Sequence, residues 1–137
     1  MNFSALEQIK TQNQFEDALS YFKDYEVTLS KINVTNNTPL FYMEILNKLF
    51  EQNNANTPEE KRKIIIESME YLKKLQKITL EIPFNASEKF AEKIYIIFQN
   101  IIKKHYLLNI IVNHQLTVGA KIQFNGQIYK YTLSNML

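Results

Sequence analysis

The chain has 137 residues, a hydrophobic fraction of 45% and a formal net charge of +2 at pH 7. This length accommodates one domain, or one domain with a small appendage. The sequence has no apolar run of about 18 or more residues and no cysteine, which excludes a membrane-spanning helix, disulfides and thiol chemistry. Acidic and basic residues alternate along the helical segments, which is typical of solvated helix faces rather than of a basic nucleic-acid-binding stripe.

The first part of the chain predicts an amphipathic helix. Ser4 and Glu7 have the spacing of a capping box, and apolar residues then recur at intervals of three and four from Phe15 to Leu29. The end of this helix is open, because residues 25–30 also alternate as a short strand would. We favour the helix.

A loop at 33–39 separates this helix from the next one. Thr38 as the cap and Pro39 at the first helical position indicate where the second helix begins. Its predicted apolar side consists of Leu40, Met43, Leu46, Leu49 and Phe50.

A third helix begins with a complete set of start signals. Thr57 can cap it, Pro58 suits the first position, and two glutamates follow at the positive end of the helix dipole. We expect this helix to bury Ile65, Met69 and Leu72 and to end near Lys77.

After this helix the apolar period changes from 3.6 to 2. Residues 78–82 alternate and predict a strand with one buried face, which Pro83 ends. Asn85 and Glu88 have the spacing of a helix cap. The apolar side of the helix that follows is predicted to contain Phe90, Ile94, Ile97 and Ile101.

The C-terminal part predicts a buried strand at 107–112 and then a hairpin. Asn125-Gly126 between two alternating runs is typical of a type I′ turn, which requires positive φ at both central residues. Thr132 can then cap a short helical turn that runs to Leu137. The alternating positions of the hairpin carry Ile122, Phe124 and Ile128.

These elements predict an α+β fold, in which N-terminal helices precede a small mixed sheet of strand, helix, strand and hairpin, with a short C-terminal helical turn. We divide the chain into a short helical region, 1–56, and an α+β module, 57–137, which includes its leading helix.

Few residues suggest catalysis. His105 and His114 have no Cys or carboxylate spacing that would make them metal ligands, and two glycines cannot form a phosphate loop. We therefore expect no enzyme, no metal and no cofactor. The hairpin residues Tyr129, Tyr131, Lys121 and Lys130 are compatible with base stacking and phosphate binding, but we favour a solvated sheet face.

The segment 113–137 contains, in order, Asn-x-x-Leu, Val118-Gly119, a strand, the Asn-Gly turn, a second strand, a Thr and a final Leu. In this order and without a gap it resembles the end of the delta subunit of F-type ATP synthases, called OSCP in mitochondria. That family ends on Asp-x-x-Leu, a Gly pair, a strand, a tight turn, a second strand, Asp-x-Ser and Leu. The matching positions here are Asn113, Leu116, Gly119, Asn125, Gly126, Thr132 and Leu137.

The resemblance covers roughly residues 60–137. Upstream of the hairpin, 78-ITLEIPFNASEKF-90 is similar to the family's strand, Val-Pro-Leu-Ser corner and acidic helix start. Val118 replaces the first Gly of the pair, and Lys130 stands where the family has Asp, which reverses a charge. Residues 1–56 do not match the six-helix N-terminal bundle of the family by motif.

The resemblance implies a non-catalytic subunit of the peripheral stalk, which lies on the cytoplasmic side of an energy-transducing membrane. The rest of the ATP synthase complex would attach this subunit to the membrane. The implied partner is the end of a b-type stalk helix. Two roles stay open for residues 1–56: contact with the N-terminal tails of the alpha subunits, or cover for the module's own core. The candidate interface residues are Phe15, Leu19, Phe22, Ile122, Phe124 and Ile128. The alternative function is a small basic RNA-binding or ribosome-associated protein.

Overall fold

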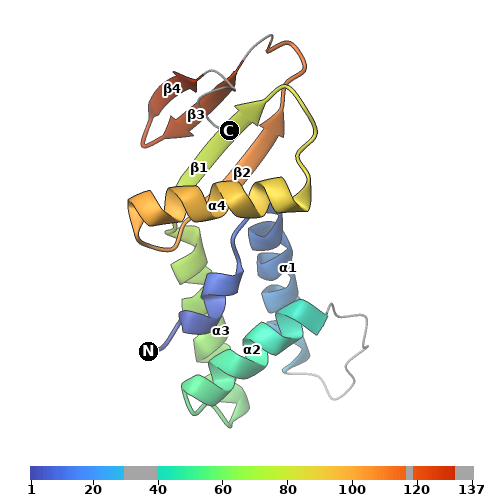
Figure 1. The fold of residues 1–137 in the computed structure, drawn as a ribbon. Helices are drawn as coiled ribbons and strands as arrows, with labels where there is room; N and C mark the ends of the chain where they lie inside the picture. Colours follow the sequence, from blue (N-terminus) through green and yellow to red (C-terminus); the bar gives the residue numbers. More distant parts are fainter. Residues whose placement is uncertain (30–39, 117–118, 132–137) are drawn as a thin grey trace. The chain divides into compact units, whose positions relative to one another are not determined.

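The computed structural model describes residues 1–29, 40–116 and 119–131. Helices precede a mixed sheet in these residues, which confirms the predicted α+β class (Figure 1). The chain forms two compact units, a helical unit (Met1–Ile9 and Asn13–Leu75) and a sheet unit (Lys10–Gln12 and Gln76–Leu137). The elements in chain order are η1 (Ser4–Gln8), α1 (Gln12–Thr28), α2 (Leu40–Gln52), α3 (Pro58–Lys73), β1 (Lys77–Ile82), α4 (Glu88–Ile102), β2 (Leu107–Val112), β3 (Ala120–Phe124) and β4 (Gln127–Tyr131).

Aromatic side chains connect the segments of the helical unit. Tyr21 of α1 lies against Tyr42 of α2 with 6.1 Å between ring centroids, and Phe3 stacks on Tyr71 of α3 at 4.9 Å. Ring pairs at these separations contribute about 0.5–1.5 kcal/mol each beyond their burial. Burial, together with the neighbouring Asp17 carboxylate, raises the pKa of Tyr42 to about 12.

The first two predicted helices of this unit are present, with differences in detail. α1 is helical as far as Thr28, so the helix and not the strand occupies this stretch. The capping box at Ser4 is wrong, because Ser4 lies inside η1, after Phe3 as the N-cap, and its hydroxyl faces Gln52 at 3.2 Å. The predicted loop at 33–39, with Thr38 and Pro39, lies outside the described residues.

The apolar side of α2 differs from the predicted one. Leu46, Leu49 and Phe50 are buried as expected, but Leu40 and Met43 are exposed at 62% and 38%. The remaining buried positions of α2 are Tyr42 and Ile45. The sequence did not resolve this choice because α2 has apolar residues on more than one side, and its neighbours η1 and α3 determine which side is covered.

α3 begins as predicted. The Thr57 hydroxyl accepts a hydrogen bond from the Glu60 backbone N–H at 3.2 Å, and Pro58 occupies the first turn. The helix ends at Lys73 rather than near Lys77, because Lys77 already begins β1. α3 packs on α2 and belongs to the helical unit, whereas the sequence division assigned it to the C-terminal module.

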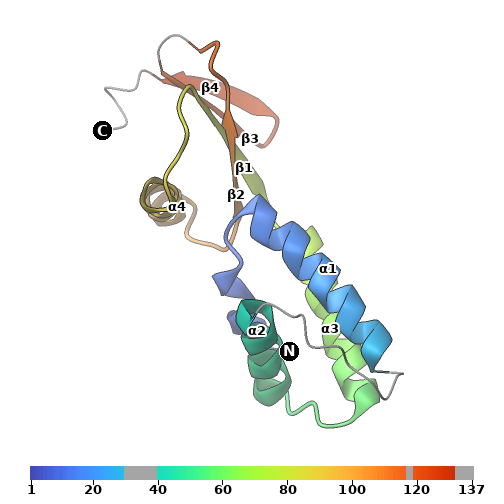
Figure 2. The same ribbon diagram turned by 90° about the vertical axis from the view of Figure 1, so that its right-hand side faces the viewer.

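The sheet of the second unit has four described strands in the order β2-β1-β3-β4. β1 pairs in parallel with β2 and antiparallel with β3, and β4 pairs antiparallel with β3. The parallel pair requires a crossover, and α4 provides it between the two strands. Figure 2, which views α4 along its axis, shows this helix on one side of the sheet.

The core of the sheet unit lies between α4 and the sheet face that carries Ile78, Leu80 and Ile82. α4 contributes Ile94 and Tyr95 to it, with Phe90, Phe98 and Ile102 partly buried around them. The helix is capped by Ser87, whose hydroxyl accepts from the Phe90 N–H at 3.1 Å, and not by Asn85 as predicted.

Two tyrosines join the end of α4 to the strand that follows it. The Tyr106 hydroxyl donates to the carbonyl of Tyr95 at 2.8 Å, and the Tyr95 hydroxyl donates to the carbonyl of Tyr106 at 3.3 Å. Their rings stack with centroids 4.5 Å apart. Burial, with Tyr95 beside it, raises the pKa of Tyr106, and both hydroxyls are satisfied inside the core.

The segment Lys10–Gln12 extends the sheet beside β2. The Leu108 N–H donates to the carbonyl of Lys10 at 2.8 Å, and Thr11 forms an isolated parallel bridge with Leu108. The ammonium of Lys10 lies 5.4 Å from the centroid of the Tyr95 ring, within cation–π distance. A short piece of the N-terminal chain therefore covers part of the β2 edge.

The hairpin turn is as predicted. Asn125 and Gly126 both have positive φ, 53° and 76°. Ile128, however, pairs with Gln123 and therefore lies on the face opposite to Ile122, contrary to the alternation assumed from the sequence.

Candidate functional site

The described residues contain no group of three or more His, Cys, Asp or Glu that could hold a metal ion. His114 is engaged at the sheet end, with its Nδ1 3.1 Å from the carbonyl of Pro83. None of the helices in the described ranges is long and apolar enough to cross a membrane. The candidate sites are therefore turns and exposed surfaces of the described residues.

The turn after β2 is tied to the end of β1 through Asn113. The Asn113 N–H donates to the carbonyl of Ile82 at 2.7 Å, and its side-chain amide donates to the carboxylate of Glu81. Its side-chain oxygen accepts from the Gln115 N–H at 3.0 Å, and its carbonyl accepts from the Leu116 N–H at 3.1 Å. Asn or Asp can supply this acceptor, but only the amide of Asn can also donate to the Glu81 carboxylate, so Asn at 113 has a local structural reason.

Gly119 also has a local reason. Its φ is 101°, in the region that favours glycine, and it immediately precedes β3. Its neighbour Val118, and Thr132 and Leu137 with the predicted last helical turn, lie outside the described residues.

The hairpin does not gather its tyrosine and lysines on one face. Lys121 and Lys130 are paired across the strands, whereas Tyr129 is paired with Ile122 and lies on the other face. A platform for single-stranded nucleic acid needs aromatic rings and cations along one groove. The described geometry of Tyr129, Lys121 and Lys130 thus gives no support to the RNA-binding alternative.

The interface residues proposed from the sequence are not brought together on one surface. Phe22 and Ile122 are buried in the cores of their own units, 0% and 9% exposed, so these side chains are not offered to a partner. Ile128 is 54% exposed but lies on the sheet face away from α4. The remaining three, Phe15, Leu19 and Phe124, are half-buried.

A larger apolar surface lies on the outer side of α4. Ile96, Ile97 and Ile101 are 54%, 47% and 73% exposed. The sequence assigned Ile97 and Ile101 to the buried side of the helix, which is wrong, because Ile94, Tyr95, Phe98 and Ile102 cover the sheet instead. The available signal was the composition of 94-IYIIFQNII-102, which has more apolar residues than one helix face can hold.

The predicted buried strand at 107–112 also has an exposed end. Leu107 and Leu108 are buried, but Ile111 and Val112 are exposed at 44% and 37%. β2 lies at the edge of the order β2-β1-β3-β4, so its last residues have a strand neighbour only on the β1 side among the described strands.

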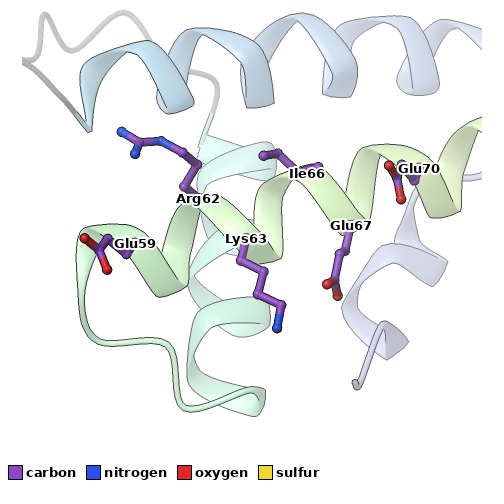
Figure 3. A pocket seen from close by; sticks show the side chains of 6 residues that line it. All are labelled: Glu59, Arg62, Lys63, Ile66, Glu67 and Glu70. Carbon is purple, nitrogen blue, oxygen red and sulfur yellow. The ribbon is translucent and has the colours of Figure 1, made fainter.

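A shallow hollow lies along α3 in the helical unit (Figure 3). Exposed Ile66 is surrounded there by charges of both signs, with Arg62 beside it and Lys63 and Glu67 projecting from the other side of the helix. Because cations and carboxylates alternate, this surface favours no ligand charge, and it is the weaker candidate.

No protein-family model matches the sequence, and no curated protein matches it significantly.

Proposed function

We propose that the protein is a non-catalytic stator subunit of an F-type ATP synthase, similar to the delta subunit, and that its sheet unit binds the end of a b-type stalk helix. In this role it lies in the peripheral stalk, on the cytoplasmic side of the energy-transducing membrane, and reaches that membrane through the complex. It needs no cofactor and no reactive side chain.

The observation that supports the proposal is the ungapped order of motifs at 113–137, together with the similar strand, corner and helix start at 78–90. A strand followed by Pro83, a helix that begins with Glu88, a turn at Asn113–Leu116 and a tight hairpin turn occur where the resemblance expects them. The two residues whose type is most restricted by the backbone, Gly119 and Gly126, have positive φ at the places where that resemblance expects a Gly and a tight turn. These positions support the proposal through their backbone conformation as well as through their residue type.

The exposed side of α4 suits a stator. A subunit that transmits torque must hold its partner through a stable surface and needs no chemistry. Three exposed isoleucines on one helix provide an apolar surface of the kind that an amphipathic helix covers.

If the sheet unit binds the stalk helix, the helical unit is the part of the chain that can contact the catalytic head. Because Phe22 is buried, a contact there would use other side chains, and Phe41, Met43 and Ile66 are exposed at 37%, 38% and 40%. The tails of the alpha subunits are the proposed partners of this unit.

The experiment is a titration of the full chain with the C-terminal helix of the b-type subunit encoded in the same genome, followed by NMR or by fluorescence anisotropy. We expect a Kd of about 10 μM or tighter, which corresponds to roughly 7 kcal/mol of binding free energy. A scrambled peptide of the same composition is the control. Absence of binding at high micromolar concentration would refute the proposal, as would a gene neighbourhood with no ATP synthase subunits in a genome that clusters them.

A further inference from the structure

The outer side of α4 combines exposed isoleucines with lysines in one row. Lys89, Lys93, Ile97 and Ile101 follow one another at intervals of four residues, so they lie along a single line on the helix. All four side chains are exposed. Ile96, three residues after Lys93, lies beside that lysine and not beside Ile97 or Ile101. We call Lys89, Lys93, Ile97 and Ile101 the lysine–isoleucine row.

The position of Lys89 is unfavourable for the helix itself. Lys89 is the second residue of α4, at the positive end of the helix dipole, where carboxylates are preferred. The apolar half is also unfavourable in the isolated chain, because 73% of the Ile101 surface is exposed to water. Local preferences that are broken together on one surface are typical of a functional surface.

The charge near this row is positive. Between residues 88 and 104 there are four lysines and two glutamates. Glu88 and Glu92 precede Ile96 at intervals of four, and Glu92, three residues after Lys89, lies beside that lysine on the helix surface, whereas Lys93 has no carboxylate three or four residues away. The lysine–isoleucine row itself contains no carboxylate.

We infer that the lysine–isoleucine row binds one amphipathic helix, whose apolar residues cover Ile97 and Ile101 and whose carboxylates meet Lys89 and Lys93. Successive members of the row are about 6 Å apart along the helix axis, because an α-helix rises about 1.5 Å per residue. The carboxylates of the partner must therefore lie about two turns away from its central apolar contacts. The identification of the partner as the b-type helix rests on the proposed function. The inference then specifies which side chains that helix must carry.

An anionic membrane would also attract lysines and isoleucines. A helix that lies in a membrane surface carries its lysines along the polar face over its whole length. In this row both lysines are at one end and both isoleucines at the other, which matches a partner with separate acidic and apolar positions. The membrane is therefore an outcome of the test and not the proposed partner.

The test uses the full chain and three peptides: the b-type helix, and two designed helices with one common Leu/Ile stripe and with either Glu or Lys at the flanking positions. Binding is measured by anisotropy at two salt concentrations. The variants are Lys93→Glu and Ile101→Ser. The matched controls are Lys130→Glu and Ile111→Ser, both exposed and on the sheet face away from α4. Circular dichroism checks that each variant folds.

We expect the Glu peptide to bind at least about tenfold more tightly than the Lys peptide, with a difference that falls as salt increases. Lys93→Glu should abolish this preference, because the row then carries one positive and one negative charge. Ile101→Ser should weaken both peptides about tenfold, while the two controls change affinity less than about twofold. Equal binding of the two designed peptides, or equal effects of the row variants and the controls, would overturn the inference.

The outcomes separate this inference from the proposed function. If the b-type helix binds but the row variants have no effect, the stator proposal stands and the inference fails. If the Glu peptide binds through the row and the b-type helix does not, the inference stands and the stator proposal fails. Binding to phosphatidylserine vesicles that depends on the row, without competition from the Glu peptide, would also overturn the inference.

Discussion

The two units of the chain use their apolar residues in different ways. The helical unit brings Phe3, Tyr21, Tyr42 and Tyr71 from different segments into its ring contacts, and the exposed apolar residues of its described part are spread over α1, α2 and α3. The sheet unit covers one sheet face with a single helix and leaves three isoleucines of that helix in water. A bundle of helices can enclose its apolar side chains from several directions, whereas a helix on an open sheet is covered from one direction only. The sheet unit thus retains an apolar face that another chain can cover.

The largest expected effect tests whether the sheet unit has a core of its own. Leu80→Ala removes a side chain that is 0% exposed in the middle of β1, and a core truncation of this kind costs about 2–5 kcal/mol. We expect hydrogen exchange of β1, β2 and β3 to accelerate while α2 and α3 keep their protection. Leu46→Ala, also 0% exposed, should give the reverse pattern in the helical unit. Equal loss of protection in both units after either change would show that they do not have separate cores.

A smaller effect is expected at the hairpin of the sheet unit. Gly126 has a φ of 76°, and a Cβ at this position would meet no atom within 4 Å, so Gly126→Ala is strained only by its backbone. We expect a loss of about 1–2 kcal/mol in the free energy of unfolding, measured by urea denaturation. Asn125→Gly, with a native φ of 53°, is the control and should cost much less. An unchanged midpoint for Gly126→Ala would contradict the described turn.

Removal of one helix cap in each unit allows a direct comparison of the two units. Thr57 caps α3 in the helical unit and Ser87 caps α4 in the sheet unit, each through one hydrogen bond to a backbone N–H. Thr57→Ala and Ser87→Ala should each cost about 1 kcal/mol in urea denaturation. Asn85→Ala is the control, because the sequence proposed it as the cap of α4 and the structure does not. A larger loss for Asn85→Ala than for Ser87→Ala would restore the sequence-based assignment.

The last expected effect is a pH dependence in the helical unit, which appears only in strongly alkaline solution. The pKa of Tyr42 is raised from 10.0 to about 12 by burial and by Asp17. Because the folded state holds this proton more tightly, the contribution of Tyr42 is complete below pH 10 and is lost as the pH rises from 10 to 12. Tyr42→Phe should flatten this part of the stability profile, measured by thermal unfolding of the helical unit. A profile identical to that of the wild type would contradict the pKa assignment.

The sequence by itself determined the type and order of the described α-helices and strands, but not η1. The Thr57-Pro58 start of α3, the alternation of 78–82 and the Asn125-Gly126 turn are local signals, in which a residue's own backbone preference or capping oxygen decides the structure. These signals need no information from distant parts of the chain.

Only the tertiary structure decided which faces are buried. α2 and α4 have more apolar residues than one face can hold, so the packing partners choose between Leu40 and Tyr42, and between Ile101 and Ile102. The sheet order, the assignment of α3 to the helical unit and the pairing of Thr11 with Leu108 join residues far apart in the sequence. The candidate surface on α4 belongs to this second group. Its isoleucines were visible in the sequence, but their exposure follows from the single sheet face that the helix covers.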